Sequence, residues 1–485
     1  MKPNVLIEKY RSLPQAARST VWFTVCNFIV AGVSFLSAPI FTRFISPQQY
    51  GLLTLFITFE QLMLILATWE LTSSAYQRGL FKFQGQWHHF TLSTILLSNG
   101  ITLAFFALLF FFFEPVSSFT GMSSTTLLVV MTMMLVQPAY QAWVVRQRTN
   151  YNYRAVVPLS IAICVLNVVL PLLAVVYIDA TAAVKFNTSM LVTAGVSLAF
   201  YVASILKGIP SYGQTTLKTH WRFLITYQAP LILHSLSYIV LGQSDRVMIG
   251  KMVGETQAAF YGVAYTMGMA AYILQNSLQI ALTPWRYQKL QDGNYPIIRS
   301  STNALLLLLG GGILLFIAVA PELMQLLFTP DYQEALWCIP PVAASFFFMF
   351  LFSIFVNVET YFEKTIYIMY ASVGVALLNI VLNLLLIPIW GYIVCAYTTL
   401  LSYILFAVVH YHFMRRICRS NLPGVSLFSM SAIVSISLLV LLLTVLLTLA
   451  YPYWYLRYAL ILLMCLVAWA YRRHIAQIVA IVRHK

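Results

Sequence analysis

Residues 426–449 read SLFSMSAIVSISLLVLLLTVLLTL, a run without any Asp, Glu, Lys, Arg or His. At about 1.5 Å per residue, a helix of this length crosses the roughly 30 Å of hydrocarbon in a bilayer. The run lacks the period-two alternation of a barrel strand, and in lipid every backbone N–H and C=O must be bonded within the protein. It therefore predicts a transmembrane α-helix.

Composition gives the rest of the chain the same character. Of the 485 residues, 61% are hydrophobic and 8% are charged, whereas an ordinary soluble domain is roughly 25% charged. So apolar a chain needs a bilayer as its solvent. The formal net charge of +15 would suggest nucleic acid in a soluble protein, but here we assign it to cytoplasmic loops and expect no nucleic-acid partner. None of the six cysteines lies in an external loop, so we expect no disulfide, and their spacing predicts no metal site.

Fourteen apolar runs are each long enough to span the membrane. They lie at residues 20–42, 51–73, 91–113, 123–145, 155–177, 184–206, 223–243, 256–282, 302–320, 336–357, 366–387, 390–413, 426–449 and 453–471. The first run is too long for a signal peptide, so we expect it to remain as a helix. The sequence therefore predicts an all-α integral membrane protein of about fourteen transmembrane helices.

The distribution of lysine and arginine tests this count, because these residues concentrate in cytoplasmic loops. With the amino terminus inside, the inside segments hold 23 of the 28 basic residues. The outside segments hold only Arg43, Lys185, Arg246, Lys251 and Arg457. One missed helix would invert every later loop, so the pattern predicts that both termini are cytoplasmic.

The two halves of the chain resemble each other. Residues 166–173 (LNVVLPLL) recur in similar form as residues 378–385 (LNIVLNLL), 212 residues later. Tyr50-Gly51 likewise recurs as Tyr261-Gly262, 211 residues later. Each match links a helix to the sixth helix after it. Because six is an even number, two six-helix lobes would enter the membrane in the same orientation, related by a pseudo-two-fold axis along its normal.

The repeat predicts how the chain is divided. We expect an N-lobe, a cytoplasmic linker, a C-lobe, two further helices and a cytoplasmic tail, at residues 1–206, 207–222, 223–413, 426–471 and 472–485. A substrate cavity is expected between the lobes.

Charged groups inside the runs are the first candidates for function. Glu60 lies near the middle of the second run, where a carboxylate costs roughly 2.5–3.5 kcal/mol on insertion scales. We expect it to face the protein interior, either as a neutral structural group or as a coupling or substrate group. His234, in the seventh run, could carry a proton near neutral pH, or be a satisfied interior histidine.

One face of the eighth run is polar along its length. At helical spacing it carries Tyr261, Tyr265, Gly268, Tyr272, Asn276, Gln279 and Thr283. Aromatic rings with polar tips suit sugar rings, so the tyrosines, Asn276 and Gln279 are predicted to line the cavity. Packing against a neighbouring helix is the alternative.

Positive charge also gathers at the outer ends of the first and seventh runs, as Arg43, Arg246 and Lys251. An arginine fork matches phosphate oxygens bidentately, so these residues predict an anionic ligand. The alternative is an ion pair at these helix ends, either Asp245 with Arg246 or Lys251 with Glu255.

Three further residues complete the predicted site. Arg78 and Arg286 end the second and eighth runs on the predicted cytoplasmic side and join the cavity set. Asp245 joins Glu60 and His234 as a candidate for ion coupling. No catalytic residue is predicted.

The chain resembles bacterial polysaccharide flippases of the Wzx type, which belong to the multidrug/oligosaccharidyl-lipid/polysaccharide (MOP) exporter superfamily. The resemblance lies in residues 38–51 (APIFTRFISPQQYG), in Asp245-Arg246 with Gly250, Gly254 and Tyr261, and in the repeated segments at Asn167 and Asn379. It covers about residues 1–415, and it departs from the family pattern at Ala259, where glycine is common.

This resemblance implies a carrier that turns an undecaprenyl-diphosphate-linked oligosaccharide from the cytoplasmic to the outer leaflet of the bacterial cytoplasmic (inner) membrane, for O-antigen lipopolysaccharide or exopolysaccharide. It implies alternating access, in which the lobes rock about a cationic, water-filled cavity. Arg43 and Arg246 would attract the diphosphate. No cofactor is implied, and coupling to H⁺ or Na⁺ stays open. Expected partners are membrane lipids, a polysaccharide polymerase and glycosyltransferases.

Other functions are weighed on the same residues. An enzyme acting outside the cell is disfavoured, because every outside segment is short and the largest, about 321–335, holds no paired carboxylates on a scaffold. No P-loop is present, which disfavours an ATP-driven pump. A cation-coupled multidrug (MATE-like) antiporter, supported by Glu60 and His234, and the peptidoglycan lipid-linked precursor flippase remain as alternatives.

Overall fold

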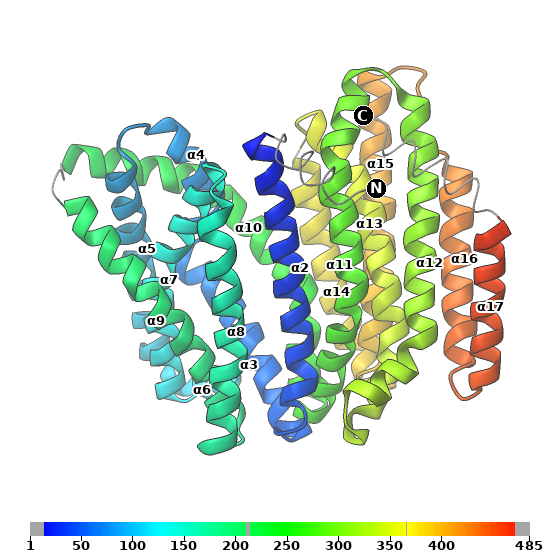
Figure 1. Ribbon diagram of the computed structural model, residues 1–485, viewed down its shortest axis with the longest axis horizontal. Helices are drawn as coiled ribbons and strands as arrows, with labels where there is room; N and C mark the ends of the chain where they lie inside the picture. The colour runs from blue at the N-terminus through cyan, green and yellow to red at the C-terminus, as the bar shows by residue number, and fades with distance from the viewer. Residues whose placement is uncertain (1–13, 210–213, 365, 471–485) are drawn as a thin grey trace, which may run out of the picture. The chain divides into compact units, whose positions relative to one another are not determined.

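The computed structural model describes residues 14–209, 214–364 and 366–470, and these ranges are almost entirely helical (Figure 1). No strand occurs within them. The chain divides into two compact units, unit 1 (Met1–Val240) and unit 2 (Leu241–Lys485).

The helices of unit 1 follow one another with short connections. They are α2 (Gln15–Phe41), α3 (Pro47–Thr68), α4 (Ser74–Lys82), α5 (Trp87–Phe111), α6 (Phe113–Thr120), α7 (Ser124–Thr149), α8 (Tyr153–Tyr177), α9 (Ala182–Gly208) and the first part of α10 (Gln214–Met252). Hydroxyl side chains cap several of their first turns. Ser46 and Ser123, for example, accept hydrogen bonds from the backbone N–H groups of Gln49 and Thr126, at 3.4 and 3.2 Å, which satisfies donors that a helix start leaves unpaired.

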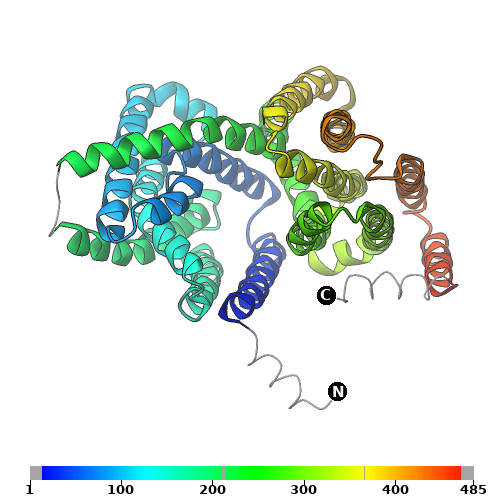
Figure 2. The same cartoon turned by 90° about the horizontal axis from the view of Figure 1, so that it is seen from above.

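Unit 2 contains the rest of α10 and the longer helices. These are α11 (Glu255–Gln291), α12 (Tyr295–Leu327), the 3₁₀ helix η2 (Pro330–Cys338), α13 (Ile339–Tyr361), α14 (Ile366–Trp390), α15 (Val394–Asn421), α16 (Met430–Leu449) and α17 (Trp454–Ala470). The last two lie at the edge of unit 2, where both contact α12 (Figure 1, Figure 2).

Each of the fourteen predicted runs coincides with a helix, and the all-α membrane fold is confirmed. The count of fourteen spans is not confirmed. Within the described residues, eleven helices are long and apolar enough to cross a membrane, or twelve if the two halves of α10, bent near residue 230, form one span. The polar face of α11 lowers its hydropathy, and the apolar part of α17, Trp454–Leu463, is short for a span.

The two units pack their helices in the same order. In unit 1, α3, α5 and α7 contact one another, and α9 packs against both α7 and α8. In unit 2, α11, α12 and α13 do the same, and α15 packs against both α13 and α14.

Equivalent side chains repeat this order in detail. Asn167 of α8 donates to the Thr193 hydroxyl of α9 at 3.4 Å, and Asn379 of α14 donates to the Ser402 hydroxyl of α15 at 3.3 Å. This agreement supports the predicted internal repeat.

The structure describes part of the predicted linker. Residues 214–222 are helical and begin α10, while residues 210–213 and the predicted tail at 472–485 lie outside the described residues. The first turns of α10 pack against other helices of unit 1, because the His220 ring meets those of Phe83 and Phe90, at 4.5 and 5.1 Å between centroids. Lys82 also lies over the Phe223 ring, 4.5 Å from its centroid.

Candidate functional site

A buried polar network in unit 2 surrounds Asp245 on α10. This side chain is fully buried, at 0% exposure. Its Oδ1 accepts a hydrogen bond from Asn383 Nδ2 of α14 at 2.6 Å. Its Oδ2 accepts from the Tyr261 hydroxyl of α11 and the Thr399 hydroxyl of α15, both at 2.5 Å. The carboxylate therefore joins four helices of one unit.

A second layer of polar side chains extends this network. Asn383 Oδ1 accepts from the Thr398 hydroxyl, and Asn383 Nδ2 also lies 3.4 Å from Asn379 Oδ1. All of these side chains are buried. A buried carboxylate without a cationic partner is costly, and here only neutral donors hydrogen-bond to it.

The oxygen atoms of this network determine which ion it could bind. It consists of carboxylate, amide, hydroxyl and phenol oxygens around a single negative charge, which suits a proton or a hard monovalent cation better than a multivalent ion. Among the described residues no group of three His, Cys, Asp or Glu side chains could hold a metal ion.

The structure separates Asp245 from the basic residues predicted at the outer end of the seventh run. The sequence places Asp245 and Arg246 together at the outer end of the seventh helix, but neighbouring residues on a helix point about 100° apart. Asp245 points into unit 2, whereas Arg246 donates to Gln243 Oε1 and lies over the Tyr265 ring, 5.0 Å from its centroid. Within the described ranges no ion pair joins the two.

The polar face of α11 is largely covered by α13 within unit 2. Gln279 donates to Asn357 Oδ1 at 3.3 Å and accepts from the Ser353 hydroxyl at 3.0 Å. The Tyr272 ring lies 5.7 Å from that of Phe346, and a Cβ added at Gly268 would come within 3.0 Å of Phe346 and Val342.

The structure thus gives this face a helix-packing role, apart from Tyr261 in the Asp245 network. Tyr265, Tyr272, Asn276 and Gln279 are half-buried. Their contact with substrate stays a prediction.

The predicted basic residues differ in their burial. Arg43, Arg78 and Lys251 are exposed, whereas Arg286 is 2% exposed. Its guanidinium lies over the Phe350 ring, 5.7 Å from the centroid, and its three nitrogens have no hydrogen-bond partner among the described residues.

Arg78 and Arg286, which end the second and eighth predicted runs, lie in different local structure. After Thr68 the chain breaks at Trp69 and Glu70, both with positive φ, and Arg78 lies on the separate helix α4. The helix α11 continues unbroken through Arg286. The difference arises because only unit 1 interrupts the second helix of its repeat.

The other two coupling candidates, Glu60 and His234, belong to unit 1. Glu60 is half-buried in α3 and forms no ion pair within the described part of the chain. The backbone of His234 lies in α10, but its side chain falls outside the described residues.

Two pairs of ionisable side chains escaped the sequence analysis. Glu359 of α13 and His410 of α15 are both 0% exposed, with Oε1 and Nδ1 2.8 Å apart. Arg457 of α17, one of the basic residues on the predicted outside, donates to Glu322 Oε2 of α12 at 2.7 Å. The partners are 51 and 135 residues apart in the chain, so no local pattern could have paired them.

Two helical units of repeated topology with polar groups buried inside define a class of protein, the α-helical membrane transporters built from repeats. Solved structures share this fold. The lipid II flippase MurJ, in an inward closed conformation, is 14% identical with a TM-score of 0.71, and the match covers 94% of this chain and 100% of MurJ.

Two multidrug transporter structures resemble the chain less closely. A mutant of the MATE transporter VcmN of Vibrio cholerae is 15% identical with a TM-score of 0.53, covering 84% of this chain and 97% of its own. An inward-facing MATE family transporter of the MOP superfamily is 12% identical with a TM-score of 0.50, covering 84% and 96%. These likenesses establish the fold.

The family follows from the sequence. The profile of the family described as "Polysaccharide biosynthesis protein" matches residues 16–289, and the chain belongs to this family. Both main segments of the predicted resemblance, residues 38–51 and 245–261, lie inside the match, so the predicted family is confirmed. No curated protein sequence matches the chain.

Proposed function

We propose that this protein is a flippase that moves a polyprenyl-diphosphate-linked oligosaccharide across the bacterial cytoplasmic membrane for surface polysaccharide biosynthesis, by alternating access. The observation that carries the proposal is the family match over residues 16–289 in a chain whose fold matches the lipid II flippase MurJ over 94% of its length. A polyprenyl-diphosphate carrier would keep the oligosaccharide anchored in the bilayer by its lipid tail while the sugars move from one leaflet to the other. The proposed partners are therefore this lipid-linked oligosaccharide and the glycosyltransferases and polymerase that make and extend it.

The orientation belongs to the proposal as well. The ends of the helices that carry most lysines and arginines face the cytoplasm, and both chain termini lie on that side, because basic loops are retained there during insertion.

We further propose that the Asp245 network couples transport to a proton or a sodium ion. The network joins α10, α11, α14 and α15, so a change of charge at its centre bears on the packing of four helices. A bound cation or proton neutralises the carboxylate, and the Tyr261 and Thr399 hydroxyls can rotate to present lone pairs to a cation. An ion that binds one arrangement of these helices more tightly shifts the balance between conformations by that difference in affinity.

A specific observation favours one alternative, carriage of lipid II itself. The TM-score with MurJ, 0.71, exceeds those with the MATE transporters, 0.53 and 0.50. Lipid II is also a lipid-linked saccharide, so the same cavity chemistry would serve both substrates. The buried carboxylate in turn suits a cation-coupled multidrug antiporter.

Deletion in the bacterium that encodes the chain separates these three functions. Under the proposal, surface polysaccharide disappears while lipid-linked oligosaccharide accumulates, and the wild-type chain restores it. Rescue of cells that lack their own lipid II flippase would favour the peptidoglycan alternative. Unchanged surface polysaccharide together with lost efflux of cationic dyes would overturn the proposal in favour of an antiporter.

A further inference from the structure

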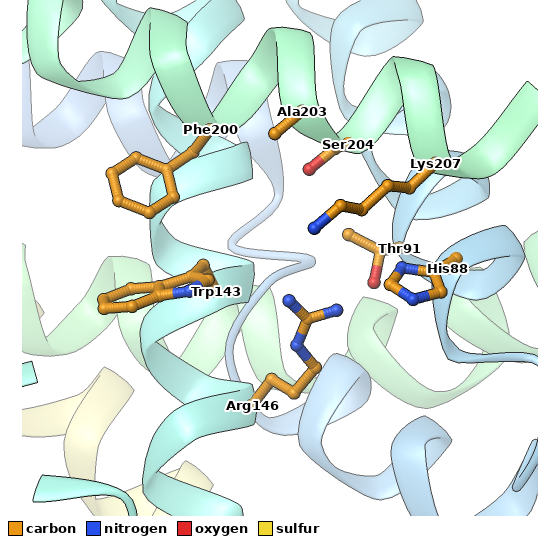
Figure 3. A pocket seen from close by; sticks show the side chains of 8 residues that line it. All are labelled: His88, Thr91, Trp143, Arg146, Phe200, Ala203, Ser204 and Lys207. Atoms are coloured by element: carbon orange, nitrogen blue, oxygen red, sulfur yellow. The ribbon is translucent and has the colours of Figure 1, made fainter. Parts of the chain in front are cut away.

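Unit 1 contains a basic pocket that the proposed function does not use. It has a volume of about 210 Å³ and is lined by side chains from α5, α7 and α9, namely His88, Thr91, Trp143, Arg146, Phe200, Ala203, Ser204 and Lys207. Figure 3 shows the Arg146 guanidinium and the Lys207 ammonium pointing toward the same space from opposite sides, with the His88 ring beside them.

The pocket lies at one end of its three helices. α5 begins at Trp87, while α7 ends at Thr149 and α9 ends at Gly208. This is the end that the distribution of basic residues assigns to the cytoplasm. In the orientation proposed above, on which this step rests, the pocket lies near the depth of the inner-leaflet head groups.

Its charge is positive and uncompensated. No acidic side chain lines the pocket, and within the described residues neither Arg146 nor Lys207 forms an ion pair. Like charges held together in a partly enclosed space repel each other, so an anion between them is favourable. Arginine and lysine side chains are the usual partners of phosphate oxygens.

The pocket is lined by polar side chains that can donate hydrogen bonds and by two aromatic rings, those of Trp143 and Phe200. The Thr91 hydroxyl is already bonded to the Trp87 carbonyl at 2.7 Å and to the Tyr76 hydroxyl at 2.6 Å, which leaves Arg146, Lys207, His88 and Ser204 to meet a ligand. The rings of Trp143 and Phe200 pack at 4.8 Å between centroids. Tryptophan is enriched at the head-group level of a membrane, which fits Trp143 at this end of the helices.

We propose that this pocket binds a single phosphate group, carried by an anionic phospholipid of the inner leaflet or free in the cytoplasm. Basic pockets between membrane helices on the cytoplasmic side bind lipid head groups in other proteins. The volume of about 210 Å³ is below the roughly 300–1,000 Å³ of pockets that hold drug-sized ligands, so it suits a head group better than an oligosaccharide. The site belongs to unit 1 and is independent of the Asp245 network in unit 2.

The test uses the delipidated full chain in detergent. Binding of phosphatidylglycerol, phosphatidylcholine and inorganic phosphate is measured by native mass spectrometry for the wild type and for the variant Arg146→Gln/Lys207→Gln. The matched control is Arg415→Gln/Arg416→Gln, which removes the same charge from two exposed positions on α15. Thermal unfolding without ligand checks folding, and the single variant Lys207→Gln, at an exposed position, replaces the double variant if that variant does not fold.

We expect the pocket variant to bind phosphatidylglycerol roughly tenfold more weakly than wild type, as the loss of charge-assisted hydrogen bonds implies, and the control to bind as wild type does. Binding of phosphatidylglycerol but not inorganic phosphate identifies a lipid as the source, and binding of both identifies the phosphate group alone. Equal binding by the pocket variant and the wild type, or equal loss in the control, overturns the proposal. So does a wild type that binds none of the three probes.

Discussion

Replacing Asp245 separates the structural from the coupling role of the buried network. In Asp245→Asn, the side-chain oxygen can still accept from Asn383 Nδ2, and the new amide can donate to the Tyr261 and Thr399 hydroxyls once these rotate. The network then stays satisfied while its negative charge is lost. We expect this variant to melt close to the wild type.

Asp245→Ala instead leaves buried donors without an acceptor. The Tyr261 and Thr399 hydroxyls lie 3.5 Å apart and can partly satisfy each other, so we count two unsatisfied groups. At about 1–3 kcal/mol each, the cost is roughly 2–6 kcal/mol. This variant should melt clearly below Asp245→Asn in the same detergent.

Transport measured in vesicles tests the coupling. The wild type should respond to collapse of the proton gradient or to replacement of Na⁺ by K⁺, and Asp245→Asn should transport slowly and respond to neither. Asp331→Asn, at an exposed position of η2, is the matched control and should behave as wild type. An Asp245→Asn protein that keeps the full ion response would refute the coupling role, and equal melting of the Ala and Asn variants would refute the account of the network.

Three further predictions concern packing. Gly268→Ala places a Cβ within 3.0 Å of Phe346 and Val342, so it should destabilise the α11–α13 contact by about 1–3 kcal/mol. The control Gly311→Ala, whose Cβ would meet nothing within 4 Å, should not lower the melting temperature. Equal melting temperatures of the two variants would contradict this packing. Arg457→Met removes the bonds to Glu322 and the Ala318 carbonyl, and we expect a loss of roughly 1–3 kcal/mol, visible as early proteolysis near α17; an unchanged digest would count against the pair as an anchor. Asn379→Leu breaks the bond to Ser402 in the buried network of unit 2, and Asn167→Leu breaks the equivalent bond to Thr193 in unit 1. The first should lower the melting temperature more, because only Asn379 is fully buried, and the reverse order would contradict the assignment.

The helix positions were predictable because the backbone of a long apolar run in lipid must satisfy its own hydrogen bonds, which an α-helix does. All fourteen runs coincide with helices, and the repeat at Asn167 and Asn379 reappears as equivalent hydrogen bonds. Whether a helix counts as a span was less predictable, because the polar face of α11 is satisfied by α13 rather than by sequence neighbours.

The site was predictable only in part, because burial depends on contacts that sequence spacing does not encode. Asp245 was a candidate, but its partners Asn383 and Thr399 lie 138 and 154 residues away. Glu359 and His410, which lie 51 residues apart, were missed for the same reason. Identical residue types at Arg78 and Arg286 acquired different surroundings because a helix break follows Thr68 in unit 1 alone.

Leaflet accessibility of a lipid-linked oligosaccharide tests the central claim most directly. Vesicles with and without the purified chain are loaded with undecaprenyl-diphosphate oligosaccharide in the inner leaflet, and a membrane-impermeant reagent modifies the sugars that reach the outer leaflet. The account predicts rapid modification only in vesicles that contain the chain, with Asp245→Asn slower. Equal modification in vesicles with and without the chain would contradict it.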